Sequence, residues 1–263
     1  MMGSGTQSAC YVYGVVPADT TTPEGLTGLG DPPAPVTLLP EGGIAAVVSE
    51  IPADGPLGNA HDLRSHAHVL DTLAATGTPV LPFRFGAVLA DAQAVGTDLL
   101  TPAEEKFRGA LEELDGWVQF TVRGSYSEER LLRDVLAARP DIADLREATR
   151  GMPEEAERHQ LIRLGEMVAD AVAAARSQDS QELVERLGPH AGASRRAEST
   201  TGDEAVHTSF LVRIDERLGF EQAAEELALR WADRIRLRLL GPLAPYDFAV
   251  AAVQDGGAGD EAA

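Results

Sequence analysis

The sequence predicts an α+β protein built from two domains. Short segments in which apolar and polar residues alternate are typical of strands, and longer segments with an apolar residue every three to four positions are typical of amphipathic helices. Both kinds recur along the chain, separated by stretches rich in proline and glycine. With 263 residues and 44% hydrophobic residues, the chain is long enough for two ordinary domains with real cores.

The domain boundaries follow from changes in composition and from helix stop signals. A polar leader precedes the first strand, Gly116 ends a helix near the middle of the chain, and a tail rich in Gly, Asp, Glu and Ala follows the last apolar segment. We therefore predict four parts: a disordered leader at 1–9, an N-terminal α+β domain at 10–116, a second domain at 117–250, and a disordered acidic tail at 251–263.

The first half is predicted to contain several strands and two helices. The first helix has clear ends, because Asn59 can cap it, Asp62 lies in its first turn and Gly77 can end it. The second helix is predicted to start at a capping box between Thr101 and Glu104. The strands are predicted at 10–16, 36–39 and 44–51, with a turn at 40–43.

A further strand is predicted at 79–88, immediately after the first helix. Alternation would place Leu81, Phe83 and Phe85 together on one face. Pro82 cannot donate a ladder hydrogen bond, so this strand should lie at a sheet edge or carry a bulge there. Arg84 stands among apolar and proline neighbours and needs a partner. An internal ion pair is the favoured role for Arg84, and a contact with a partner protein is the alternative.

The second half predicts the order strand, helices, strand, strand, helix, strand. This order indicates a ferredoxin-like βαββαβ motif with a helical insertion in its first crossover. A capping box at 125–128 should open the first helix, and Ser177–Ser180 could kink the longest one. In the last strand, Ile235, Leu237 and Leu239 should face inward and the arginines at 234, 236 and 238 outward. The strands are predicted at 117–123, 193–197, 208–215 and 234–240, and the helices at 128–139, 141–149, 153–187 and 220–232.

The charge of the chain excludes two classes of partner. With 22 basic and 42 acidic residues the net charge is −20, which is unfavourable for binding nucleic acid or an anionic membrane surface. No apolar run approaches the length of a membrane span, and the N-terminus lacks a signal pattern. The sequence therefore predicts a cytoplasmic protein.

No catalytic, cofactor or metal site is predicted. His61, His66 and His68 lie near Asp62, but their spacing on a helix does not converge on one ion, so we interpret them as surface and packing residues. Cys10 lies on a predicted strand without a basic neighbour and is expected to be a buried, inert thiol. The glycine clusters lack the lysine of a phosphate-binding loop.

Three segments together resemble one known family. "PVLPFRFGAV" at 79–88, "YVYGVV" at 11–16 and "LRLLGPLAPYDFA" at 237–249 are similar to the signature segments of the gas vesicle protein F/L family, in the same order. The resemblance implies a two-domain protein whose second half has a modified ferredoxin fold. It also implies a non-enzymatic role in gas vesicle assembly.

The expected partners are the hydrophobic shell protein and other accessory proteins of the gas vesicle, with no nucleic acid and no membrane. Two alternatives remain open: a minor structural component of the vesicle, and an enzyme that uses an interdomain cleft. Tyr246 and Phe248 are expected to pin the C-terminal extension across a sheet. The candidate partner-binding or interdomain residues are Arg84, Pro82, Phe85, Tyr246 and Phe248.

Overall fold

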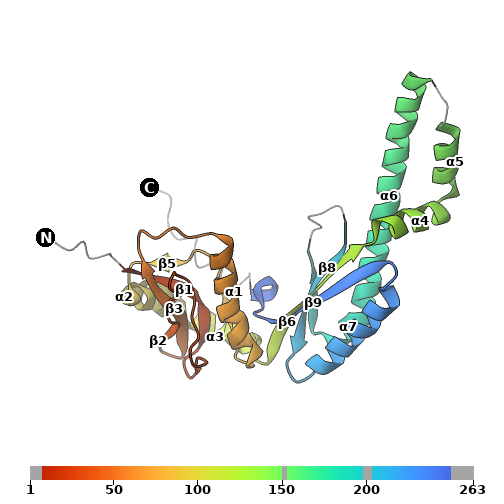
Figure 1. The fold of residues 1–263 in the computed structure, drawn as a ribbon. Helices are drawn as coiled ribbons and strands as arrows, with labels where there is room; N and C mark the ends of the chain where they lie inside the picture. Colours follow the sequence, from red (N-terminus) through yellow and green to blue (C-terminus); the bar gives the residue numbers. More distant parts are fainter. Residues whose placement is uncertain (1–7, 150–152, 198–202, 250–263) are drawn as a thin grey trace. The chain divides into compact units, whose positions relative to one another are not determined.

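The computed structural model describes residues 8–149, 153–197 and 203–249 (Figure 1). The predicted tail at 251–263 lies outside these residues, as does the predicted leader apart from Ser8 and Ala9, which begin the first strand. Contacts divide the chain into two compact units. The first unit comprises Met1–Phe120, Leu211–Asp215 and Gly241–Ala263, and the second comprises Thr121–Phe210 and Glu216–Leu240. This division differs from the predicted ranges at 117–120, 211–215 and 241–249, and the domain assignment stays a prediction.

The first unit is built on one sheet. Its strands follow the order β2-β3-β1-β4, and β5 also pairs with β1. All of the pairings with β1, and that of β2 with β3, are antiparallel. The strands are β1 (Ser8–Pro17), β2 (Thr37–Glu41), β3 (Ile44–Pro52), β4 (Leu81–Pro82) and β5 (Val88–Leu89).

The side chains of β1 alternate between two cores, and a register shift changes which positions face each core. The shift lies between Val12 and Gly14, and it reverses the alternation along the strand. Before it, Tyr11 joins one core and Val12 the other, and after it Val16 joins the core of Tyr11. Helix α1 (Ala60–Ala75) contributes to the first core and α3 (Thr101–Glu113) to the second. The sheet is therefore covered on both faces.

The predicted strand at 79–88 is two short strands with a loop between them. Pro82 lies in β4 at the sheet edge, as predicted. Leu81 and Phe83 share a core, but Phe85 packs against the opposite one, so its predicted face was wrong. The reason is that β4 ends at Pro82, so Phe85 lies in a turn and no longer follows the alternation of a strand.

The N-terminal caps of α1 and α3 differ from each other. Asn59 caps α1 as predicted, and Asp62 in the first turn, which accepts from the amide of Asn59, completes a capping box. The predicted box at 101–104 is absent, because α2 (Ala92–Ala94) and the π-helical segment η1 (Val95–Leu100) run directly into α3. Glu104 Oε1 instead accepts a hydrogen bond of 3.0 Å from the amide of Gly43. Residues 92–100 had no predicted element.

The larger part of a second sheet belongs to the second unit, with the strand order β7-β8-β6-β9. The elements follow one another as strand, three helices, strand, strand, helix, strand (Figure 1). A short 3-10 turn, η2 (Gly188–His190), precedes β7. The strands are β6 (Trp117–Tyr126), β7 (Ala193–Arg196), β8 (Glu204–Arg213) and β9 (Ile235–Leu243). The helices are α4 (Glu128–Ala138), α5 (Pro140–Thr149), α6 (Glu154–Leu187) and α7 (Arg217–Trp231).

Helix α6 is continuous where a kink at Ser177–Ser180 was considered. Within this stretch the buried carboxylate of Asp179 accepts a 2.6 Å hydrogen bond from Tyr126 Oη and pairs with Arg234. Arg234 also lies 5.4 Å from the ring centroid of Trp231. Of the outward arginines at 234, 236 and 238, Arg234 therefore faces helix α6 and forms an ion pair with it. The predicted box at 125–128 does not form either, since Ser127 caps α4 without a side-chain bond.

Candidate functional site

A buried hydrogen-bond chain holds the loop between β4 and β5. The amide of Gly86 donates to Tyr11 Oη over 3.1 Å, and Tyr11 Oη lies 2.9 Å from His66 Nδ1. His66 Nε2 lies 3.1 Å from the carbonyl oxygen of Phe83. One strand, one helix and both ends of the 83–86 loop are thus joined through two side chains.

The bonding partners determine which ring nitrogen of His66 carries the proton. A carbonyl oxygen can only accept, so Nε2 donates to Phe83 and Nδ1 accepts from the hydroxyl of Tyr11. Burial lowers the pKa of His66, which keeps the ring neutral, and the bond to Phe83 opposes this weakly. Burial raises the pKa of Tyr11 to about 12, so its hydroxyl stays protonated and can donate. The chain is fully satisfied in its neutral form.

The second tyrosine of the segment at 11–16 anchors a different loop. Tyr13 Oη donates to Ser49 Oγ over 3.0 Å and accepts from the amide of Leu29 over 2.9 Å. Ser49 Oγ in turn donates to the carbonyl of Pro35. These bonds fasten the long Gly- and Pro-rich connection between β1 and β2 to the sheet. The two tyrosines of this segment therefore each hold one loop.

The segment after Gly241 packs within the first unit near the same histidine. The ring of Tyr246 lies 6.2 Å from that of His66, and the ring of Phe85 lies 5.7 Å from it. The amide of Ala244 donates to Asp71 Oδ1 on α1 over 2.9 Å. Residues far apart in the sequence therefore meet in one aromatic cluster, which we call the His66 cluster: Tyr11, Tyr13, His66, Phe85 and Tyr246.

The five predicted site residues do not form one exposed surface. Pro82 is buried and pairs with Gly14, while Phe85, Tyr246 and Phe248 are half-buried. Phe85 and Tyr246 lie in the His66 cluster. Burial, with a contribution from Asp71, raises the pKa of Tyr246. Only Arg84 is exposed.

The favoured sequence interpretation of Arg84, an internal ion pair, was wrong. Across residues 8–149, 153–197 and 203–249, Arg84 makes no ion pair and no hydrogen bond through its guanidinium. The physical reason is exposure: water solvates the guanidinium, so no internal carboxylate is required. The loop therefore presents a free cation beside a fixed aromatic residue.

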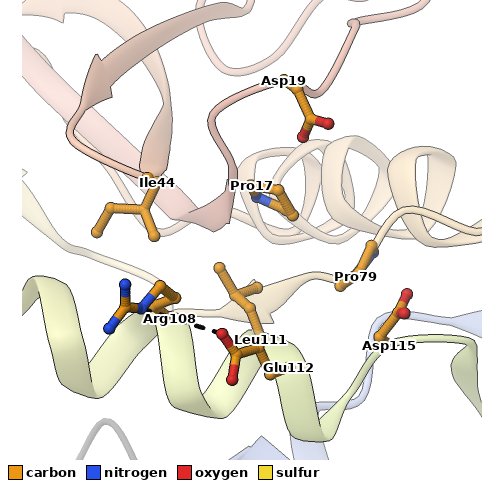
Figure 2. Close-up of a pocket in the computed structure, with 9 residues that line it drawn as sticks. Pro17, Asp19, Ile44, Pro79, Arg108, Leu111, Glu112 and Asp115 are labelled. Atoms are coloured by element: carbon orange, nitrogen blue, oxygen red, sulfur yellow. Dashed lines mark ion pairs between the residues drawn. The ribbon is translucent and has the colours of Figure 1, made fainter.

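A pocket of about 530 Å³ lies elsewhere in the first unit (Figure 2). Ile44 and Leu111 are buried and form apolar parts of its wall, with Pro17 beside them. Glu112 faces Arg108 at 4.0 Å, an exposed pair of small energetic value. The remaining wall residues are Asp19, Gly43, Pro79 and Asp115.

His66, Asp62 and Cys10 have structural roles. Both ring nitrogens of His66 are in hydrogen bonds, and Asp62 accepts from the amides of Gly58 and Asn59. In the portion of the chain that the structure describes, no group of three His, Cys, Asp or Glu residues is placed to hold a metal ion. Cys10 is buried, and burial with nearby Glu50 and Asp91 raises its thiol pKa, which favours the unreactive form.

Asp71 provides a prediction about stability. Burial raises its pKa to about 6 from 3.8, so its charge destabilises the fold as the pH rises through that interval. Replacing Asp71 with asparagine keeps an oxygen for the Ala244 amide and removes the charge. We expect a gain of about 1–2 kcal/mol in the free energy of unfolding at about pH 7.5, allowing for partial exposure. Urea titration would measure it.

The gain should shrink at about pH 4.5, where the folded protein has largely neutralised the aspartate. Asp54 is exposed, and its replacement with asparagine should change stability little at either pH. An Asp71→Asn variant with no gain, or with a gain that does not depend on pH, would contradict the role of burial.

Sequence reasoning did not find the role of His66 or the pairing of Asp71 with Ala244. The signal for His66 was its position on α1, four residues before Leu70 on the apolar stripe. The contact of Asp71 with Ala244 could not be predicted from the sequence, because the two residues are 173 positions apart. Among the residues that the structure describes, no helix combines the length and the apolar character needed to span a membrane.

Comparisons with known proteins cover nearly the whole chain. The family model described as "Gas vesicle synthesis protein GvpL/GvpF" matches residues 9–250. Gas vesicle protein F of Streptomyces sp. (strain CB03234) is 36% identical over 239 residues, covering 90% of this chain and 98% of the relative. Gas vesicle protein L of the same strain is 30% identical over 260 residues, covering 93% and 94%.

Solved structures agree on the fold. The crystal structure of gas vesicle protein GvpF from Microcystis aeruginosa superposes with a TM-score of 0.74 at 24% identity, covering 92% of this chain and 98% of that one. The structure of GvpF from Anabaena sp. PCC7120 gives 0.73 at 24% identity, covering 92% and 96%. The fold is thus the mixed α and β fold of these proteins. From the match over residues 9–250, the chain belongs to the gas vesicle synthesis protein GvpL/GvpF family.

Proposed function

We propose that this protein is a non-enzymatic accessory protein that supports the nucleation and assembly of gas vesicles in the cytoplasm. It would bind the hydrophobic shell protein, other accessory proteins of the vesicle, or both. Membership of the GvpL/GvpF family and the names of its relatives support a role connected with gas vesicles. A shell monomer is apolar and prone to aggregate before assembly, so a highly charged partner could keep it dispersed.

One observation carries the protein-binding role: the exposed, unpaired Arg84 on a loop that is fixed from beneath. The loop is held through Tyr11 and His66, two buried polar residues. A buried polar network that is fully satisfied makes the structure around it rigid, so the geometry of this loop is well defined. The guanidinium that it presents does not serve the fold. A fixed cation with five hydrogen-bond donors suits a carboxylate or backbone carbonyls of another protein.

The perturbed ionisable groups support a non-enzymatic role. His66 and Tyr11 bond each other and the backbone, and Asp71 bonds Ala244. Tyr126 bonds Asp179, and burial together with this bond raises the pKa of Tyr126. Perturbed pKa values point to catalysis when the groups also converge in a cleft. Here His66, Tyr11, Asp71 and Tyr126 each have an evident structural partner.

The architecture of the second unit is part of the proposal. We infer a ferredoxin-like βαββαβ class, with α4, α5 and α6 as the expanded first crossover. The order of elements and the neighbouring strands β7-β8-β6-β9 support it. Strand addition at the Pro82 edge is less well supported as a mode of binding, because β4 has only 2 residues and Pro82 has no amide to donate.

The test is retention of the shell protein by the full-length chain. Replacing Arg84 with glutamate reverses one exposed charge and should reduce co-purification with the shell protein at least tenfold, since the cation is exchanged for a repelling anion. Arg217 is also exposed, so Arg217→Glu is a matched control and should bind normally. Equal retention by both variants, or no retention by the unmodified chain at low and moderate salt, would overturn the proposal.

The remaining alternative is a minor structural component of the finished vesicle. Washing intact vesicles and probing them for this chain separates the two roles. A transient assembly factor should be lost on washing, whereas a structural component should stay.

A further inference from the structure

Strand β9 provides the longest sheet edge among the described strands. It lies at the end of the order β7-β8-β6-β9 and has 9 residues, against 4 for β7 at the other end. In the first unit, the edge strands β2 and β4 have 5 and 2 residues, and each contains a proline. The part of β9 in the second unit, Ile235–Leu240, contains no proline. Its outer side therefore presents backbone groups that another strand could bond.

The side chains of this edge segment are divided between two faces. A Cβ added to Gly124 would lie within 2.9 Å of Ile235 and Leu237, so both of these side chains lie over Gly124. Alternation then places Arg236, Arg238 and Leu240 on the opposite face. All three are exposed, Leu240 by 40%.

The two arginines have no internal role that the described residues reveal. Neither Arg236 nor Arg238 forms an ion pair or a side-chain hydrogen bond with any residue that the structure describes. Their neighbour Arg234 differs, because Asp179 neutralises it. The edge segment thus combines an open backbone with two free cations in a protein of net charge −20.

Charge decides which strand the edge segment can accept. Two copies pairing antiparallel about Leu237 would place Arg236 of one copy opposite Arg238 of the other. Like charges directly opposite in a sheet are destabilising, whereas opposite charges contribute favourably. Self-association through this edge is therefore disfavoured, and a strand with carboxylates at alternate positions is favoured.

We propose that the Ile235–Leu240 edge binds an extended acidic segment of a partner protein by strand addition. Backbone hydrogen bonds give the segment its alignment, and its alternate carboxylates face Arg236 and Arg238. An apolar side chain two positions further along covers Leu240. This site is distinct from the Arg84 loop and goes beyond the proposed binding of the shell protein.

The experiment uses fluorescence anisotropy of short labelled peptides titrated with the full-length protein. The probe peptide carries glutamate and valine in alternation, and we expect saturable binding that weakens as salt is added. A second peptide has the same sequence with alternate backbone amides methylated. It keeps the charge but loses the backbone donors, so its binding should fall at least tenfold.

Variants of the protein separate the contribution of charge. Replacing both Arg236 and Arg238 with glutamine should weaken binding of the probe by about two- to thirtyfold, the value of two exposed ion pairs. Arg217→Gln removes one exposed charge elsewhere and should bind the probe normally. Circular dichroism of each variant checks that the fold is intact.

Two results would overturn the proposal. One is the absence of binding at millimolar peptide, and the other is equal binding of the methylated peptide, which would indicate attraction by charge alone. Both results leave retention of the shell protein by the unmodified chain unaffected, so failure here is distinguishable from failure of the proposed function.

Discussion

Replacement of Gly14 by alanine is expected to destabilise the first unit by about 3 kcal/mol, near the upper end for inserting a methyl group into a packed interior. Gly14 lies in β1 opposite Pro82 in β4. An added Cβ would lie 2.5 Å from the carbonyl oxygen of Leu81 and 3.2 Å from the Cα of Pro82. These are backbone atoms, which cannot rotate away as a side chain can. Relief requires the separation of β4 from β1.

The measurement is urea unfolding, together with hydrogen exchange of the Phe83 amide, which bonds the carbonyl of Tyr13 over 2.9 Å. Gly109 is a matched control, because a Cβ added there meets nothing within 4 Å and the residue lies inside α3. Gly109→Ala should raise stability by about 0.5–1 kcal/mol, since alanine favours a helix interior. A Gly14→Ala variant as stable as the parent would show that the two strands are less tightly apposed than described.

Replacement of His66 by alanine is expected to cost about 3–4 kcal/mol, the sum of a cavity and of two polar groups that lose partners. The carbonyl of Phe83 would lose its donor, and Tyr11 Oη would lose its acceptor. The loop carrying Arg84 should open more often, so exchange of the Gly86 amide should accelerate well beyond the change in global stability. Urea unfolding and hydrogen exchange measure the two effects.

His61 supplies the control for His66. It lies on the same helix but is exposed, and His61→Ala should change stability by less than about 0.5 kcal/mol. Nitrogen NMR should find His66 protonated on Nε2 alone. Because its pKa is lowered, the folded state binds fewer protons than the unfolded state at acid pH, and stability should fall as the pH drops through about 6.5. A charged His66 at neutral pH would contradict the bonding scheme.

Loss of the His66 hydrogen bonds should also change the position of Arg84 on its loop. Tyr11 on β1 and His66 on α1 hold the 83–86 loop in place. Both side chains are buried, so neither is available for direct contact with a partner protein. Weakening the network should therefore reduce partner binding even though the arginine is unchanged. His66→Ala should lie between the parent and Arg84→Glu in retention of the shell protein.

The sequence by itself determined the elements whose signals are local. The helix cap at Asn59 and the edge position of Pro82 follow from neighbouring residues, and both are present. The resemblance to the family also depended on short segments, and their order along the chain was sufficient to identify the family.

Only the tertiary structure decided the contacts that join distant residues. The capping box predicted at Thr101 is absent because η1 continues directly into α3. The box predicted at Ser125 is absent because β6 extends to Tyr126, so that α4 starts after Ser127. Arg234 forms an internal ion pair because helix α6 places Asp179 next to it. Arg84 forms no ion pair with the described residues because its side chain is exposed to water. A local pattern states which groups need partners, but the fold decides which groups come within reach, since each such contact depends on the whole chain that lies between its residues.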